Sequence, residues 1–193
     1  MERMEQMASL AAEVMRRSFI DEIRDIFQSL GQGSQQIKDS IATAVMAALH
    51  EAAQKEKAPI AYVSFSLLQS NLLLGRYALR VDAWDKRFLL DDDEASSEWD
   101  FQFMFQRSGP DMDAVAAKVR ETMTRVQDYE LKELERAYCL NYYAIAFEVF
   151  RAALPSCFPA LMKNPALWAD EVNFTVGAYM EQQQLICQWR PEI

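Results

Sequence analysis

Alternating apolar and polar residues inside an otherwise helical sequence are the feature that most constrains the fold of this chain. Between residues 60 and 107 the alternation has a period of two in three stretches, which contain Phe65, Val81 and Phe103. This period predicts strands of a sheet with one buried face and one polar face. Helical spacing of three and four residues occurs before and after the block. We therefore predict an α+β fold.

The two regions that flank this block predict helices. Residues 4–57 carry apolar side chains at helical spacing, interrupted by Gly31 and Gly33, and predict an N-terminal helical hairpin. Residues 110–154 predict two helices with a break near 127–132, because one unbroken helix would be about 65 Å long. The second of these helices is apolar on more than one face. We expect this long helix to pack on an antiparallel sheet of three to five strands.

The C-terminal segment, residues 165–193, permits two interpretations. Val172, Phe174 and Val176 alternate with polar residues and predict one strand of a β-hairpin that adds to the sheet. A helix over 171–184 is the alternative, because its last residues are good helix formers. The sequence contains neither an internal repeat nor a long linker, so we expect the 193 residues to form a single domain.

Charge and hydropathy exclude several classes of partner. The chain has 20 Lys and Arg against 29 Asp and Glu, a formal net charge of −9, and the excess of acid is spread along the sequence. Because nucleic acids and anionic membranes are bound largely through Lys and Arg, we expect neither as a partner. The N-terminus lacks the apolar run of a signal peptide, and polar residues interrupt the most apolar stretch, 137–154. We therefore expect a cytoplasmic protein that does not cross a membrane.

Motifs that would require a particular chemistry are missing from the sequence. His50 is the only histidine, so a multi-histidine metal site within one chain is impossible. The five glycines form neither a Walker loop nor a dinucleotide-binding pattern. The acidic run Asp91–Glu94 lacks the spacing and the central glycine of an EF-hand and predicts a solvated turn. We therefore predict no catalytic residue, no metal site and no cofactor.

Polar side chains on the long apolar helix form the best candidate site. Tyr138, Asn141 and Tyr142 are three and four residues apart and share a face, which Glu148 and Arg151 approximately continue. A buried carboxylate must be paired or hydrogen-bonded, and such groups gather at functional sites. We predict these five residues as ligand-binding candidates. The structural alternative is an ion pair between Glu148 and Arg151, with the tyrosines bonded to polar groups at the edge of the core.

Two tryptophans are candidates for a contact surface. Trp84 falls on the polar face of its predicted strand, and the pairs Trp84-Asp85 and Trp99-Asp100 lie on either side of the acidic run. Aromatic anchors dominate many protein interfaces. Trp84 and Trp99 are therefore interface candidates, with coverage by the chain's own helices as the alternative.

Taken as a whole, the sequence favours a non-catalytic, cytoplasmic binding or protein-interaction domain. An acidic, motif-free composition with 10 Met and 11% aromatic residues suits an adaptable contact surface. We expect a protein partner or self-association. An enzyme or a small-ligand sensor that uses the polar cluster around Glu148 is the alternative, with a small molecule as its ligand.

Overall fold

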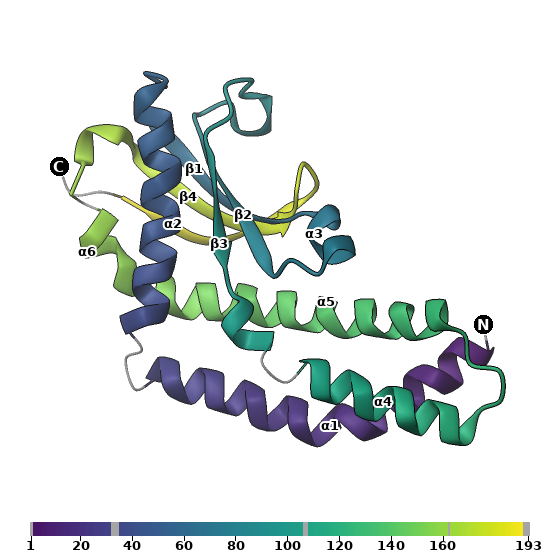
Figure 1. The fold of residues 1–193 in the computed structure, drawn as a ribbon. Helices are drawn as coiled ribbons and strands as arrows, with labels where there is room; N and C mark the ends of the chain where they lie inside the picture. The colour runs from purple at the N-terminus through teal and green to yellow at the C-terminus, as the bar shows by residue number, and fades with distance from the viewer. Residues whose placement is uncertain (1, 32–34, 106–107, 162, 191–193) are drawn as a thin grey trace.

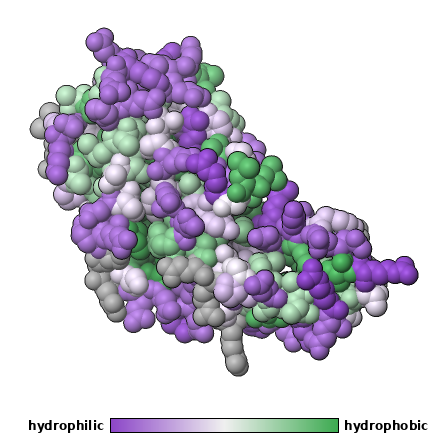
Figure 2. Space-filling view, viewed as in Figure 1, coloured by the Kyte–Doolittle hydropathy of each residue, from purple (hydrophilic) through white to green (hydrophobic). Residues whose placement is uncertain are grey.

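The chain forms a five-stranded sheet and several long helices (Figure 1). The computed structural model describes residues 2–31, 35–105, 108–161 and 163–190. The α+β class predicted from the sequence is confirmed, with five strands in one sheet and a long apolar helix packed on it. Hydrophilic side chains cover most of the face shown in Figure 2, and hydrophobic ones gather there in small patches.

The sheet is mixed and has the strand order β3-β2-β1-β4-β5. Its strands are β1 (Ile60–Leu67), β2 (Ala78–Trp84), β3 (Ser96–Asp100), β4 (Trp168–Ala178) and β5 (Gln183–Trp189). Neighbouring strands are antiparallel except β1 and β4, which are parallel, so the expectation of an antiparallel sheet is wrong at this pair. The helical crossover returns the chain to the start of β1, where Trp168 pairs with Ile60, and the two strands then run in the same direction.

The third strand is shorter than predicted. β3 ends at Asp100, whose Oδ1 accepts a hydrogen bond from the amide of Gln102 at 2.8 Å, just where the 3-10 turn η2 (Gln102–Phe105) begins. The apolar alternation continues beyond Asp100 and predicted a strand there. The turn instead lets the rings of Phe101 and Phe105 pack on tyrosines of the long helix. Residues 106–107, at the predicted end of the block, lie outside the described residues.

The C-terminal segment forms a β-hairpin, and the alternative helix is not observed. Strands β4 and β5 pair antiparallel, and Val172, Phe174 and Val176 are buried in the core. The short elements elsewhere in the chain are α3 (Gln69–Leu74), η1 (Phe88–Leu90), η3 (Leu154–Cys157), α6 (Phe158–Leu161) and η4 (Pro165–Leu167).

The two N-terminal helices are present but do not pack against each other as a hairpin. Helix α2 (Gln35–Gln54) lies across the sheet and contacts β2 and β3, whereas α1 (Glu2–Gly31) lies beside α4 (Ser108–Thr122) and α5 (Asp128–Ala153) (Figure 1). The reason is that α2 buries its strip of small and branched side chains against the sheet. Gly33, one of the two glycines predicted to end the first helix, lies outside the described residues.

A short break separates α4 from α5. It lies at residues 123–127, a few residues earlier than most of the predicted range 127–132. The amide of Gln127 donates a hydrogen bond to Oε2 of Glu130 at 2.8 Å. Gln127 immediately precedes α5, and Glu130 is the third residue of the helix. A bond of this kind is half of a capping box, and it fixes the start of α5 at Asp128.

Two hydrophobic cores share α5. The larger lies between the sheet, α2 and the C-terminal half of α5, where Phe150 stacks on Phe65 of β1 with ring centroids 3.8 Å apart. The smaller lies where the N-terminal half of α5 extends beyond the sheet beside α1 and α4, and it contains Met7, Val115 and Leu134. We call these three packed helical segments the arm. The arm therefore has an apolar core of its own.

The segment Asp128–Leu161, which contains α5, is long and apolar enough to cross a membrane by length and composition. Inside the structure, 44% of its most apolar window is buried. The core helix of a soluble protein passes the same test, and α5 supplies Leu134 and Phe150 to the two cores.

Among the glycines that the structure describes, Gly177 of β4 is the one at which an added methyl group meets the closest atoms. A Cβ there would lie 2.5 Å from the backbone oxygen of Gln182 and 3.0 Å from the Gln183 side chain. Gly177→Ala should therefore lower the free energy of unfolding by about 1–3 kcal/mol, the usual range for overpacking. Urea denaturation measures this loss, and Gly109→Ala, with no atom within 4 Å of the added carbon, should show none.

Candidate functional site

A buried row of four polar side chains joins the three helices of the arm. Tyr138 of α5 donates a hydrogen bond to Oδ2 of Asp111 on α4 at 2.7 Å, and its hydroxyl oxygen lies 2.9 Å from that of Tyr142. Tyr142 donates in turn to Oε2 of Glu22 on α1. We call Asp111, Tyr138, Tyr142 and Glu22 the phenol–carboxylate chain. All four residues are buried, with none more than 9% exposed.

Helix geometry explains how these side chains meet. Tyr138 and Tyr142 are one turn apart on the buried face of α5, which places their hydroxyls side by side. Phe19 of α1 packs against both rings, with centroid distances of 5.9 and 5.4 Å. Glu22 follows Phe19 by three residues and so lies on the same face of α1. Asp111 is in the first turn of α4, where the free amides favour a carboxylate.

Burial keeps both phenols protonated. It is the largest cause that raises the pKa of Tyr142, and the hydrogen bonds with Glu22 and Tyr138 act in the same direction. Burial is also the largest cause that raises the pKa of Tyr138, where the bond with Tyr142 opposes the shift and the bond with Asp111 adds to it. Both pKa values lie well above the usual range, so neither phenol ionises at neutral pH.

An apolar groove between α1 and α5 opens beside the phenol–carboxylate chain. It has a volume of about 460 Å³. We call it the interhelical groove, and its walls are formed by Ala8, Ala11, Ala12, Met15, Arg16, Phe19, Ile20, Leu134, Ala137, Tyr138 and Asn141. Ile20 is 48% exposed. The groove therefore presents apolar surface to solvent, with three polar side chains at its walls.

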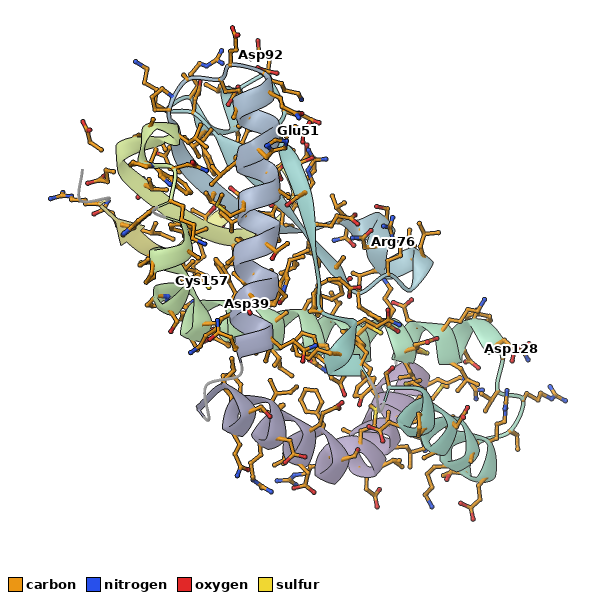
Figure 3. All side chains as sticks on the ribbon, turned by 60° about the vertical axis from the view of Figure 1, so that its left-hand side comes forward. Asp39, Glu51, Arg76, Asp92, Asp128 and Cys157 are labelled. Atoms are coloured by element: carbon orange, nitrogen blue, oxygen red, sulfur yellow. The ribbon has the colours of Figure 1, made fainter. Side chains whose placement is uncertain are left out.

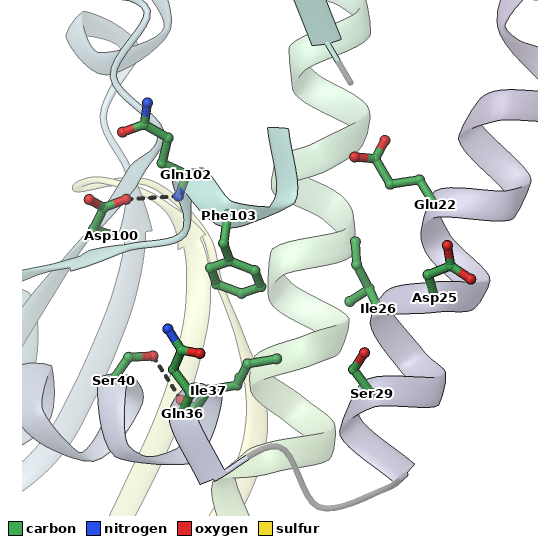
Figure 4. Close-up of a pocket in the computed structure, with 10 residues that line it drawn as sticks. All are labelled: Glu22, Asp25, Ile26, Ser29, Gln36, Ile37, Ser40, Asp100, Gln102 and Phe103. Atoms are coloured by element: carbon green, nitrogen blue, oxygen red, sulfur yellow. Dashed lines mark hydrogen bonds between the residues drawn. The ribbon is translucent and has the colours of Figure 1, made fainter. Parts of the chain in front are cut away.

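Glu22 also lines a second cavity, which is acidic. This cavity has a volume of about 620 Å³ and lies where α1, α2 and η2 meet. Glu22 and Asp25 approach it from α1, Asp100 approaches from the end of β3, and Phe103 lies between them (Figure 4). Within the described part of the chain, no group of three or more His, Cys, Asp or Glu could hold a metal ion.

The structure brings some of the predicted ligand-binding candidates together and separates others. Tyr138 and Tyr142 belong to the phenol–carboxylate chain, and Asn141 is exposed at the interhelical groove. Glu148 and Arg151 are on the solvent side of α5, with side chains 58% and 40% exposed, and lie 3.5 Å apart as an ion pair. Glu148 and Arg151 therefore form the ion pair that was the structural alternative to a ligand site. They do not lie in a common site with Tyr138 and Tyr142.

Both tryptophans predicted as interface candidates are buried, with exposures of 2% for Trp84 and 1% for Trp99. Trp84 Nε1 donates to Ser64 Oγ at 3.1 Å, and the ring of Phe88 packs against the indole. Trp99 Nε1 donates to Ser40 Oγ of α2 at 3.0 Å. The interface prediction is wrong for these two residues, because other segments of the chain cover them.

A separate buried carboxylate lies on the polar face of the sheet. Asp82 of β2 is 1% exposed, and its Oδ1 accepts a hydrogen bond from Arg80 Nε at 2.7 Å. Burial raises the pKa of Asp82 to about 6, against the opposing effect of Arg80. Arg80 also lies over the ring of Tyr179 and 3.2 Å from Glu94. Through these contacts Arg80 joins the acidic run and the turn after β4 to strand β2.

The acidic run is not a solvated turn throughout. Asp92 is exposed and lies at the opposite end of the molecule from Asp128 (Figure 3). The side chain of Asp91, in contrast, is fully buried and pairs at 2.7 Å with Lys57, whose side chain is 2% exposed. Arg87 also reaches Asp91, at 3.1 Å. The prediction is therefore wrong for Asp91, because two basic side chains converge on it.

No family model, no curated protein and no solved structure matches this chain. The site is therefore defined by geometry alone.

The sequence analysis did not identify Glu22 and Asp111 as site residues, although the sequence around each carries a signal. Glu22 lies between Phe19 and Ile26 on the apolar stripe of its helix, and Asp111 precedes Val115 by one turn. An acidic residue at a core position of an amphipathic helix was the pattern to look for.

Proposed function

We propose that this protein is a non-catalytic binding domain of the cytoplasm, and that its interhelical groove takes an amphipathic helix of a partner protein. The observation that carries the proposal is the apolar surface between α1 and α5, where Ile20 remains 48% exposed. Contiguous exposed apolar surface rimmed by polar residues is typical of interaction sites.

The dimensions of the groove favour a helix as its occupant. From Ala8 to Ile20 the wall formed by α1 is about 18 Å long, which equals about three turns of a helix. Ala8, Ala12 and Ala137 are small and exposed along the groove, so the backbone of another helix can approach closely. A helix bound in such a groove presents apolar residues at spacings of three, four and seven.

The polar side chains of the groove restrict the chemistry of the partner. Arg16 is the charged side chain among the described residues that line it, and Asn141 offers an amide on the opposite wall. A carboxylate beside the apolar stripe of the partner helix would pair with Arg16. We therefore propose an amphipathic helix that carries an acidic residue next to its apolar face.

A cytoplasmic location is supported by the cysteines and the charge. Cys139, Cys157 and Cys187 are free, which suits a reducing compartment. The net charge of −9 opposes binding to nucleic acids or to anionic membranes. The chemistry of the groove, with its apolar walls, agrees with a protein partner instead.

The groove is tested by placing a photo-crosslinking amino acid at Ala137 and, as a control, at Ala144. Both alanines are exposed on α5, but only Ala137 lines the groove among the described residues. Illumination in native cytosol should capture a partner at position 137 and not at 144, through a segment with helical apolar spacing and an adjacent acid. Absence of a crosslink specific to position 137 would contradict the proposal.

A synthetic peptide of the captured segment then gives a quantitative test. Ala137→Arg places a long charged side chain in the groove and should weaken binding of the peptide at least about tenfold, or about 1.4 kcal/mol. Ala144→Arg makes the same change outside the groove and should leave the affinity unchanged. Because both alanines are exposed, both variants should keep the melting temperature of the unaltered protein. Equal effects of the two substitutions on affinity would exclude the groove as the binding site.

A further inference from the structure

We propose that the occupant of the interhelical groove is helix α1 of a second copy of this chain, so that two copies form a symmetric dimer with their α1 helices antiparallel. The dimer rests on the proposed function, because it names the partner of the same groove. Helix α1 runs along the side of α5 that faces away from the sheet (Figure 1). Its outer side carries exposed apolar residues with acidic residues beside them, which are the features that the groove requires of its occupant.

Apolar side chains stay exposed on the side of α1 that borders the groove. Ala8, Ala12 and Ile20 line the groove and are exposed. Phe27 follows Ile20 by seven residues, or about two turns, and is 37% exposed. These spacings place the four side chains on one side of the helix. Because a helix bound in a groove presents apolar residues at such spacings, α1 of one copy can occupy the groove of another.

Helix α5 also carries exposed apolar side chains. Tyr129 and Leu140 are 71% and 43% exposed, and Leu140 follows Ala137 of the groove wall by three residues. Within the described residues of α2 and α4, no large apolar side chain is exposed. The exposed apolar surface of the long helices is therefore concentrated on the two that form the groove.

Exposed charged residues are placed symmetrically along α1. Glu13 and Arg16 are equally far from the point between residues 14 and 15, and so are Glu5 and Arg24. Arg24 pairs with Asp21 at 2.7 Å. For Glu5, Glu13 and Arg16, no ion pair occurs within the part of the chain that the structure describes. These three charges are therefore available to another molecule.

A two-fold axis at this point brings the charges into pairs of opposite sign. When two α1 helices lie antiparallel about the axis, Glu13 of one copy is opposite Arg16 of the other. Glu5 is opposite Arg24 in the same way, and each pair occurs twice because the interface is isologous. A parallel arrangement would set each charge opposite its like. Arg16 lines the groove, so the axis also places an acidic residue of the second copy beside it.

The apolar residues and the charges have different roles in the dimer. Burial of apolar surface supplies the affinity. Exposed ion pairs contribute little free energy, but they select the orientation and register of the two helices. The segment from Glu5 to Arg24 is about 28 Å long and extends over the whole groove. The small side chains of Ala8, Ala12 and Ala137 let the two backbones approach closely.

The mass of the purified protein in solution is the first measurement. At about 100 μM, sedimentation should give twice the mass of one chain, since a dimer with a dissociation constant in the micromolar range is largely formed at that concentration. Ala137→Arg should give a monomer, because it places a long charged side chain in the groove, and Ala144→Arg should not. An unaltered protein that stays monomeric at this concentration would overturn the dimer.

Charge reversals test the antiparallel register. In a dimer, Glu13→Arg sets two pairs of arginines opposite each other, and Arg16→Glu sets two pairs of glutamates opposite each other. Each variant alone should therefore dimerise at least about tenfold more weakly than the unaltered protein. An equimolar mixture of the two variants restores pairs of opposite charge and should recover the dimer. Both positions are exposed, so both variants should keep the melting temperature.

Matched controls come from α4, which contributes no described residue to the groove. Lys118→Glu and Glu121→Arg reverse exposed charges at the same spacing of three residues. Alone or mixed, these variants should leave the dissociation constant of the dimer unchanged. Equal weakening by the reversals on α1 and α4, or a mixture of the α1 variants that does not associate, would contradict the antiparallel dimer.

Crosslinking separates failure of the dimer from failure of the proposed function. A photo-crosslinking residue at position 137 of the purified protein should join two copies, and one at position 144 should not. If the purified protein is monomeric and position 137 captures a different protein in cytosol, the dimer is overturned and the proposed function stands. If neither experiment gives a crosslink specific to position 137, both are overturned.

Discussion

Phe150→Ala is expected to lower the free energy of unfolding by about 3–5 kcal/mol, the usual range for removing a buried aromatic ring. The ring of Phe150 is completely buried and stacks on Phe65, which joins α5 to the central strand of the sheet. The vacated space is bounded by side chains of the sheet and of α5, which relax only in part. Urea denaturation followed by tryptophan fluorescence measures the loss.

Phe27→Ala provides the matched control for this substitution. Phe27 is on α1 and is 37% exposed, so its removal leaves a smaller void and returns less apolar surface to water. We expect a loss of less than about 1.5 kcal/mol. Similar losses for Phe150→Ala and Phe27→Ala would show that the contact between α5 and the sheet does not dominate the larger core.

Asp91→Asn is expected to have an effect of similar size, about 3–5 kcal/mol, because it breaks a buried ion pair and leaves one charge without its partner. Asp91 Oδ2 accepts hydrogen bonds from Lys57 Nζ at 2.7 Å and from the amide of Asp85 at 2.9 Å. The Lys57 side chain is only 2% exposed, so water does not replace the lost carboxylate. Thermal or urea unfolding at neutral pH measures the change.

Asp92→Asn tests whether burial is the cause. Asp92 is the next residue, and its side chain is 90% exposed, so the same substitution should change stability by less than about 0.5 kcal/mol. Burial acts to raise the pKa of Asp91, but the Asp85 amide, Lys57 and the Asp93 amide together lower it below 3.8. The stability from this group is thus present above that pH and lost in acid, and Asp91→Asn should lack this part of the acid transition.

Local patterns predicted the class of fold, because the burial of one face of a strand or helix is visible within a few residues. The alternation around Phe65 and Val81 marks β1 and β2, and both side chains are buried in the larger core. The direction of β4 relative to β1 depends on a crossover of about one hundred residues, and no local pattern encodes it. The separation of α2 from α1 likewise depends on long-range packing, because α2 packs on the sheet and α1 packs on α4 and α5.

The candidate site was predicted in part for the same reason. Tyr138 and Tyr142 are one turn apart, and the structure places their hydroxyls together. Glu148 is six residues beyond Tyr142, which is more than one and a half turns and places it on another side of α5. The partners Glu22 and Asp111 come from helices far away in the sequence, so their pairing with the tyrosines depended on the packing of the arm.

The helix of the arm that is synthesised first packs on the two helices that are synthesised later. Helix α1 is synthesised first, yet it packs on α4 and α5, and Arg3 pairs at 2.6 Å with Glu130. Because the ribosome adds about 5–20 residues per second, the apolar stripe of α1 lacks these packing partners for on the order of ten seconds. During that time α2 and the first three strands can already assemble. The N-terminal helix therefore stays without its packing partners until α4 and α5 have been synthesised, long after its own synthesis is complete.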